Sequence, residues 1–349
     1  MSLSIGVSVV LHESAADIAD CLSSVAGRAA PDDVVVLDNA STDDGAAVAQ
    51  GALRDACVIR SVRNLGFAGG QNHAISHLTT DLVLVLNPDC RIAPDFLATA
   101  IAAFEADPGL GAMSGRLLRF RPNDPSGGPL TELNDDVLDS TGLVGLRNRR
   151  VLDRGSEEPG AGRYRHRAFV FGASGAAAVY RRTMLEDVAF EGEIFDERFF
   201  AYREDVDIAW RAQLLGWRCL YEPTALARHW RRVTPTRRRS LPAWINRRSV
   251  ANRWRMLLKN ETVTGWRRDG AAILARDAQI LGYSLLREWT TLPAVTEVTR
   301  DLPRLRAQHL DLMRRRRADE AEVADWFGRV DERPSTPPMT ALNNERMSP

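Results

Sequence analysis

Apolar and polar positions alternate along the first hundred residues in a way that separates strands from helices. Short unbroken apolar runs bounded by turn residues are typical of strands buried on both faces of a parallel sheet. Four such runs occur, at residues 3–11, 34–37, 57–62 and 82–86. Between them, apolar residues recur three and four positions apart, as Ile18, Leu22 and Val25 do. The alternation predicts βαβ units and therefore an α/β protein with a mostly parallel sheet.

The most distinctive strand is predicted at residues 82–86, which are all Leu or Val. Asn87, Pro88 and Asp89 follow it directly. The strand must end there, because Pro88 has no backbone N–H to donate to a neighbouring strand. Open α/β sheets bind their ligands at the carboxyl ends of their strands. Asp89 is therefore expected at a binding site.

Other polar residues are expected at the same edge of the sheet. Asp38 follows the second strand, and the pair Glu204-Asp205 begins a predicted helix. Further along, two short strands are predicted at 217–221 and 225–230, and His229 lies in the second of them. Such carboxylates suit three tasks: binding a base or sugar hydroxyl, holding a divalent cation, and acting as a general base. Each also has an ordinary structural explanation, as a turn former, a helix-dipole partner or a packed histidine.

The composition narrows the class of protein. A chain of 349 residues with 44% hydrophobic residues suffices for one large α/β domain with an appendage, or for two domains. The net charge is zero, so no overall field attracts polyanions such as nucleic acid. The four cysteines form no CxxC pair, which argues against a zinc knuckle and suits a reducing compartment. No apolar run reaches ~18 residues, so no membrane span is predicted and a cytoplasmic protein is expected.

The composition changes beyond residue 223. Residues 223–260 hold ten Arg and one Lys but no acid, with Trp230, Trp244 and Trp254 among them. Arginine is attracted to anionic lipid headgroups and tryptophan favours the membrane interface, so the segment predicts attachment to an anionic membrane surface. Alternatively, these arginines pair with acids of residues 297–322 inside the protein. Three regions are expected: an α/β domain at 1–232, a helical region at 233–330 and a disordered tail at 331–349.

In combination, several segments resemble family 2 glycosyltransferases with the GT-A fold, over about residues 3–230. The resemblance rests on Val9-Val10-Leu11-His12, Asp38-Asn39-Ala40-Ser41-Thr42-Asp43, Asn64-Leu65-Gly66-Phe67-Ala68-Gly69-Gly70-Gln71-Asn72, Leu86-Asn87-Pro88-Asp89, Gly172-Ala173-Ser174-Gly175, Phe195-Asp196-Glu197-Arg198-Phe199-Phe200, Glu204-Asp205-Val206-Asp207 and His229. Within the family, the chain is most similar to bacterial rhamnosyltransferases that serve polyprenyl-linked cell-wall or polysaccharide intermediates. Galactofuranosyltransferases share several of the motifs.

The resemblance implies a role for each matching residue. Asp205 would be the catalytic base, with Glu204 as its neighbour, and Asp89 and His229 would bind Mg²⁺ or Mn²⁺. The nucleotide-sugar donor would be bound by Leu11, Glu13, Asp38, Asn64, Gly66, Phe67, Asn72, Asn87 and Asp89, with Asp38 on the pyrimidine ring. Two positions depart from the family pattern: Asn87 replaces the first acid of the DxD metal motif, and His12-Glu13 stands where Tyr-Asn is common.

The resemblance implies an inverting glycosyltransferase on the inner face of the cell membrane. Its expected donor is dTDP-rhamnose, with UDP-sugars second, and its expected acceptor is a lipid-linked glycan. Two other classes stay open. A nucleotidyltransferase would need a basic residue in a glycine-rich loop near the first strand, which His12-Glu13-Ser14 lacks. A non-catalytic protein would bind nucleic acid through the arginine-rich segment. The sequence leaves the oligomeric state open.

Overall fold

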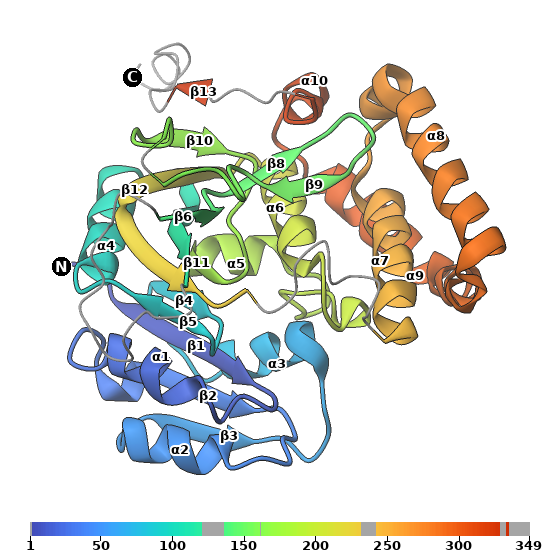
Figure 1. Cartoon of the computed structure of the whole chain (residues 1–349). Helices are drawn as coiled ribbons and strands as arrows, with labels where there is room; N and C mark the ends of the chain where they lie inside the picture. The colour runs from blue at the N-terminus through green and yellow to red at the C-terminus, as the bar shows by residue number, and fades with distance from the viewer. Residues whose placement is uncertain (1, 121–135, 161, 232–241, 329–332, 335–349) are drawn as a thin grey trace, which may run out of the picture.

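A central sheet with helices on both faces forms the body of the molecule (Figure 1). The computed structural model describes residues 2–120, 136–160, 162–231, 242–328 and 333–334. Nine strands of its 11-stranded sheet follow the order β13-β10-β12-β6-β11-β4-β1-β2-β3, while β5 pairs with β12 and β7 pairs with β6. The strands are β1 Ile5–Leu11, β2 Val34–Asp38, β3 Cys57–Arg60, β4 Leu82–Leu86, β5 Cys90–Ile92, β6 Leu110–Arg119, β7 Leu138–Ser140, β10 Ala168–Val170, β11 Ala177–Arg181, β12 Arg218–His229 and β13 Arg333–Pro334.

The first half of the chain has the predicted βαβ arrangement. Strand β1 lies between β2 and β4 and is parallel to both, and β3 extends the parallel set beyond β2. All five residues of β4 are buried, as its unbroken apolar run predicts. The helices of this half are α1 Ile18–Val25, α2 Gly45–Ala52, α3 Gly66–Ile75 and α4 Phe96–Ala106.

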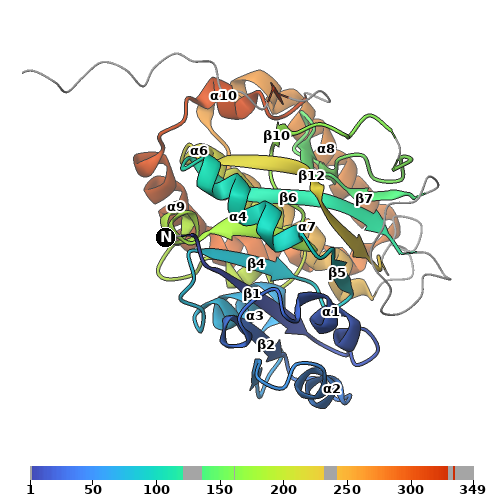
Figure 2. The same ribbon diagram turned by 90° about the vertical axis from the view of Figure 1, so that its left-hand side faces the viewer.

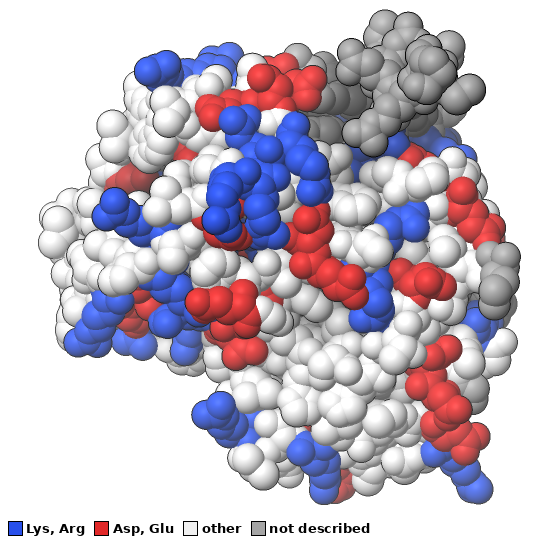
Figure 3. All heavy atoms as spheres, turned by 180° about the vertical axis from the view of Figure 1, so that it is seen from behind, with Lys and Arg blue, Asp and Glu red and all other residues white. Residues whose placement is uncertain are grey.

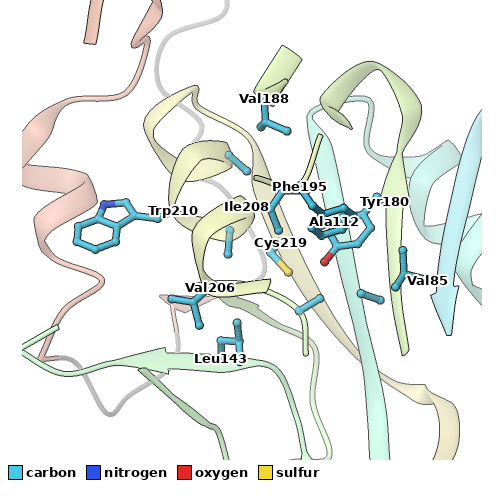
Figure 4. Packing of buried hydrophobic residues seen from close by; sticks show 14 of the residues in the cluster. Val85, Ala112, Leu143, Tyr180, Val188, Phe195, Val206, Ile208, Trp210 and Cys219 are labelled. Atoms are coloured by element: carbon cyan, nitrogen blue, oxygen red, sulfur yellow. The ribbon is translucent and has the colours of Figure 1, made fainter. Parts of the chain in front are cut away.

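Two buried clusters lie on opposite faces of the sheet. The first contains apolar residues of α1, α2 and α4, and Figure 2 shows α4 lying across the strands on that face. The second contains residues of α3, α5 (Arg182–Val188) and α6 (Glu204–Leu214). In the second cluster Phe195 meets Tyr180 edge-on, with the ring centroids 6.4 Å apart, beside Ile208 of α6 (Figure 4). This packing fixes α6, and with it Glu204 and Asp205, against the sheet.

The middle of the chain differs from the sequence-based expectation in two respects. Strand β11 runs antiparallel between β4 and β6, so the sheet is mixed at its centre, with the parallel strands β4, β1, β2 and β3 on one side of β11. The two strands expected at 217–221 and 225–230 are one strand, β12. Its pairing with β6 shifts register between Glu222 and Leu226, a stretch that contains Pro223. A proline interrupts the hydrogen-bond ladder there without ending the strand, which is how a bulge behaves.

Residues 121–162 are rich in Pro, Gly, Asp and Arg, which predicts a long loop with at most short strands, and the described part contains short strands. These are β7, β8 (Leu143–Gly145) and β9 (Val151–Asp153), and β8 pairs with β9 as a separate two-stranded sheet. Residues 121–135 and 161 lie outside the described part. The same is true of most of the expected tail, of which only Arg333–Pro334 is described, paired with β10.

The C-terminal helices pack against α6 and share its core. They are α7 Ala243–Asn260, α8 Val263–Arg287, α9 Pro293–Arg315 and α10 Glu320–Ala324, with the short helix η4 (Trp289–Thr291) between α8 and α9. Met256, Ile273 and Leu312 belong to the same buried cluster as Val206 and Trp210 of α6. Within the described residues, no helix combines the length and the apolarity needed to cross a membrane.

Candidate functional site

A cleft of about 570 Å³ opens at the carboxyl ends of β1, β2 and β4. Its walls come from the strand ends, the loop before α3, residues 200–202 and the start of α7. Of the residues predicted to bind the donor, those that line the cleft are Glu13, Asn64, Gly66, Phe67, Asn87 and Asp89. The cleft therefore lies at the edge of the sheet where the sequence places Asp89.

The loop before α3 is organised by Asn39, a residue that sequence reasoning did not single out. Its Nδ2 donates to the carbonyl oxygen of Gly66 at 2.9 Å and to Asn64 Oδ1 at 3.1 Å. Its Oδ1 accepts from the backbone N–H of Leu65 at 2.7 Å. Gly66 has φ +72°, and a Cβ at this position would overlap the backbone oxygen and the ring of Phe200. Only glycine permits this approach of the two cleft walls.

Three predicted donor-binding residues do not line the cleft. Asp38 is buried, and its oxygens accept from Ser41 N at 2.9 Å and from Arg60 Nε at 3.2 Å. Leu11 is buried within β1. Asn72 exchanges two 2.8 Å hydrogen bonds with the backbone of Phe195. In the structure all three hold the walls in place, and direct contact with a nucleotide stays a prediction for them.

Asp89 faces His229 across the end of the cleft. The distance from Asp89 Oδ1 to His229 Nε2 is 3.3 Å, and His229 Nδ1 lies 2.8 Å from Asp139 Oδ2. Asp139 is on β7 and His229 ends β12, and both strands pair with β6. Burial alone would lower the pKa of His229, but hydrogen bonds to Asp139 and Asp89 outweigh it and raise this pKa to about 9.

These residues fit a divalent cation that arrives with its substrate. A metal-binding histidine commonly gives its other ring nitrogen to a carboxylate, as His229 does to Asp139. Mg²⁺ is usually held by one or two protein carboxylates, with phosphate oxygens and water completing its shell. No group of three or more His, Cys, Asp or Glu side chains in the described ranges is arranged to hold a metal ion. Asp89 and His229 would thus supply part of a shell that a diphosphate completes.

Glu204 and Asp205 begin α6, as predicted. Asp205 Oδ2 accepts from Gly175 N at 3.2 Å, and burial followed by the charge of Asp153 raises the pKa of Asp205. Glu204 is 9% exposed, and its Oε2 is buried without a hydrogen-bond partner. Burial and the charge of Asp205 raise the pKa of Glu204 to about 8. A carboxylate with a raised pKa suits proton transfer near neutral pH.

The segment that leads into this pair has an unusual backbone. Phe200, Tyr202 and Arg203 have φ of 61°, 71° and 73°, in the left-handed region that non-glycine residues seldom adopt. Asn252 of α7 holds the segment. Its Nδ2 lies 2.9 Å from the carbonyl oxygens of Phe199 and Tyr202 and 3.1 Å from that of Ala201. The position of Asp205 thus depends on a residue 47 positions further along the chain, outside the motifs found in the sequence.

The arginine-rich segment does not present free cations where it is described. The partners are Asp136 for Arg228, Asp139 and Asp153 for Arg231, Glu297 for Arg247, Asp277 for Arg253, Asp301 for Arg255, and Asp196 and Asp207 for Lys259. Arg248 lies over the ring of Phe200 at 4.3 Å. Figure 3 likewise shows cations and acids side by side over much of the rear face. Acids distant in sequence thus pair with the described cations on which the membrane prediction rests, and attachment to a membrane stays a prediction. Residues 232 and 237–239 lie outside the described part.

Comparison with known proteins identifies the family. The family model described as "Glycosyl transferase family 2" matches residues 7–188, about half of the chain. The chain therefore belongs to glycosyl transferase family 2. A Mycobacterium tuberculosis N-acetylglucosaminyl-diphospho-decaprenol L-rhamnosyltransferase is 28% identical over 57% of this chain and 66% of the relative's length. The Rhizobium meliloti succinoglycan biosynthesis protein ExoU is 34% identical over 42% of this chain and 44% of its own length.

Solved structures show the GT-A fold. S. aureus TarS residues 1–349 in complex with UDP-GlcNAc matches with a TM-score of 0.54 and 17% identity, covering 89% of this chain and 90% of that one. GalNAc-T7 with UDP, GalNAc and Mn²⁺ also gives 0.54, at 13% identity, over 74% of this chain and 48% of that one. The predicted fold is confirmed: a mostly parallel sheet with flanking helices and a C-terminal helical region.

In this family 2 protein, the matched segment ends before several site residues. It includes Asp89, but Glu204, Asp205 and His229 lie beyond residue 188. Sequence reasoning missed Asp139, Asn39 and Asn252 as parts of the site. Asn39 directly follows Asp38 in a motif shared with the family, so the sequence did contain a signal for its place in the site. Asp139 and Asn252 carry no local signal, because each acts on a residue some 50 to 90 positions away.

Proposed function

We propose that this family 2 protein is an inverting glycosyltransferase that moves a sugar from a nucleotide to a hydroxyl of a lipid-linked glycan. The observation that supports it best is a carboxylate in the cleft together with a second acidic pair directly after a wall of the cleft. Asp89, paired with His229, lines the cleft, and the Glu204-Asp205 pair follows the wall formed by residues 200–202. One carboxylate suits a metal diphosphate and the other suits proton removal.

Asp205 is the proposed general base. Its Oδ2 is held by Gly175 N at 3.2 Å, and its raised pKa brings it toward the range in which a carboxylate accepts a proton effectively. It takes the proton from the acceptor hydroxyl, which attacks the anomeric carbon on the face opposite the nucleotide. A divalent cation held by Asp89 and His229 would neutralise the charge that grows on the departing diphosphate.

The proposed donor is dTDP-rhamnose, and UDP-sugars are the second candidates. The rhamnosyltransferase relative supports the first, and the UDP-GlcNAc complex of TarS, which shares the fold, supports the second. The same relative's name supports a polyprenyl-diphosphate-linked acceptor, since it contains a diphospho-decaprenol. Because such an acceptor is anchored in a bilayer, we propose that the enzyme works on the inner face of the cell membrane.

A donor screen tests the proposal. Thermal shift is measured with dTDP-rhamnose, UDP-sugars and GDP-mannose, each with and without Mn²⁺, for the wild type and for Asp89→Ala. We expect stabilisation by a dTDP- or UDP-sugar that Mn²⁺ enhances, and loss of the Mn²⁺ enhancement in Asp89→Ala with the fold intact. Asp55→Ala, which changes an exposed acid outside the cleft, is the matched control. Stabilisation by none of these sugars would contradict the donor assignment, and an equal Mn²⁺ effect in Asp89→Ala would contradict the metal assignment.

A further inference from the structure

Large apolar side chains gather in solvent at the C-terminal end of α8 and in η4. They are Leu281, Tyr283, Leu285, Leu286 and Trp289, exposed by 37%, 50%, 65%, 82% and 73% respectively. We call these five residues the α8 tip. Helix α8 lies at the outer edge of the molecule (Figure 1). An exposed apolar patch of this kind marks a surface that contacts something other than water.

Among the charges of α8 and η4 that have no partner of opposite sign, cations outnumber acids. Arg287 at the tip and Arg267 near the other end of α8 are exposed, and neither forms an ion pair among the described residues. Asp269 pairs with Arg149 at 2.8 Å and Asp277 with Arg253 at 2.7 Å, whereas Glu288 accepts a 2.7 Å hydrogen bond from the neutral amide of Asn246. The surface offered by α8 is therefore apolar and cationic, which complements an anionic lipid headgroup region.

The α8 tip adjoins the entrance of the cleft. Asn246 donates to Glu288, which stands between Arg287 of α8 and Trp289 of η4. In α7, Asn246 lies between Trp244 and Arg248, and both of these line the cleft. Thr291 Oγ1 donates to Ser284 Oγ at 2.7 Å, which ties η4 back to α8. A surface in contact with the α8 tip would therefore lie beside the side of the cleft that Trp244 lines.

We propose that the α8 tip inserts into the headgroup region of an anionic bilayer and holds the cleft entrance at that surface. The inference rests on the proposed function, because it explains how a lipid-linked acceptor reaches the cleft. Tyr and Trp suit this position, since each has an apolar ring and a polar group that stays hydrated. A second copy of the chain fits less well. Two α8 surfaces packed together would bring Arg267 and Arg287 of both copies into one interface, where each copy offers Glu288 as one acid against these two cations.

Vesicle flotation of the full chain, without nucleotide or acceptor, tests the inference. The vesicles contain phosphatidylglycerol mixed with phosphatidylcholine, or phosphatidylcholine alone. We expect binding to the anionic vesicles only, weakening as salt rises because the Debye length shrinks. The double variant Leu285→Ser/Leu286→Ser should lower the partition coefficient by about tenfold or more. Trp289→Ser should lower it independently, so the result does not depend on one variant.

The matched control is Leu310→Ser, which removes a leucine that is 58% exposed on α9, away from the tip. Its partition coefficient should equal that of the wild type. Unchanged binding of the double variant, an equal loss in the control, or equal binding to phosphatidylcholine alone would overturn the inference. So would a wild-type dimer in analytical ultracentrifugation that the double variant converts to monomer.

Nucleotide-sugar affinity, measured by calorimetry on the same preparations, separates this inference from the proposed function. The double variant should bind the donor as the wild type does, because the α8 tip does not line the cleft. Vesicle binding without any donor binding would support the surface and contradict the proposed function. If the wild type binds the donor but does not bind anionic vesicles, the membrane role of the α8 tip is wrong and the transferase proposal still stands.

Discussion

Replacing Asn252 by alanine should disable catalysis far more than it destabilises the protein. Asn252 is fully buried, and its Nδ2 serves the carbonyl oxygens of Phe199, Ala201 and Tyr202. Its Oδ1 accepts from Arg255 Nη1 at 2.9 Å. The alanine variant removes this partner from all of these groups, although the Phe199 carbonyl oxygen keeps a hydrogen bond from Ala201 N at 2.6 Å. The segment it holds ends at Arg203, immediately before the proposed catalytic pair.

The magnitude follows from two opposing contributions. Each buried polar group left without a partner costs about 1–3 kcal/mol. Relaxation of the left-handed residues Phe200, Tyr202 and Arg203 returns part of this, at about 1–2 kcal/mol for each residue that leaves the region. We therefore expect the free energy of unfolding to fall by about 2–4 kcal/mol. The same relaxation moves Asp205, and a displacement of about 1 Å costs about 10²-fold in rate.

The assay combines chemical denaturation with steady-state kinetics. Asn252→Ala should lower kcat by about 10²-fold and should also raise KM for the donor, because residues 200–202 form part of the cleft wall. Leu97→Ala is the control. It removes a buried side chain of α4 on the opposite face of the sheet and should cost about 2–5 kcal/mol without lowering kcat. Normal kcat in Asn252→Ala, at a stability loss like that of Leu97→Ala, would refute a positioning role for Asn252.

Two further predictions concern the walls of the cleft and the buried acid. Gly66→Ala should lower donor affinity and stability, because the new Cβ would overlap Phe200 and the backbone has φ +72° there. The control Gly51→Ala should be neutral or stabilising, because its Cβ meets nothing within 4 Å. Equal melting temperatures for the two variants would contradict the steric argument. Glu204→Gln should become progressively more stable than the wild type as pH rises from 4.5 to about 8, because folding raises the Glu204 pKa across that window and the wild type loses stability there. Urea denaturation at several pH values measures this, and a stability difference independent of pH would show that Glu204 titrates normally.

The hydrophobic pattern of the sequence predicted those parts of the fold that depend only on neighbouring residues. The β4 run of Leu and Val is buried throughout, and Asp89 follows it into the cleft, because both facts depend on neighbouring residues alone. The antiparallel insertion of β11 was not predicted, because strand direction depends on how the chain returns to the sheet. The strands predicted at 217–221 and 225–230 are the single strand β12, which continues through Pro223.

The site was predicted where a single motif supplies the chemistry and missed where distant segments meet. Glu204 and Asp205 start a helix as expected, and their raised pKa values come from burial, which an apolar neighbourhood can suggest. The carboxylate of Asp139 on His229 could not be predicted, because β6 brings their strands together. The pairing of the cations in the acid-free stretch 223–260 could not be predicted for the same reason: the acids that pair with them come from other elements.

Single-turnover sugar transfer by Asp205→Asn and Glu204→Gln tests the central claim most directly. Asparagine has nearly the shape of aspartate but cannot accept the proton, so Asp205→Asn should bind the donor normally and turn over at least ~10²-fold more slowly. Glu204→Gln should keep its rate within about tenfold of the wild type, since its carboxyl group is already protonated at neutral pH. Wild-type turnover in Asp205→Asn would contradict the account of Asp205 as the general base.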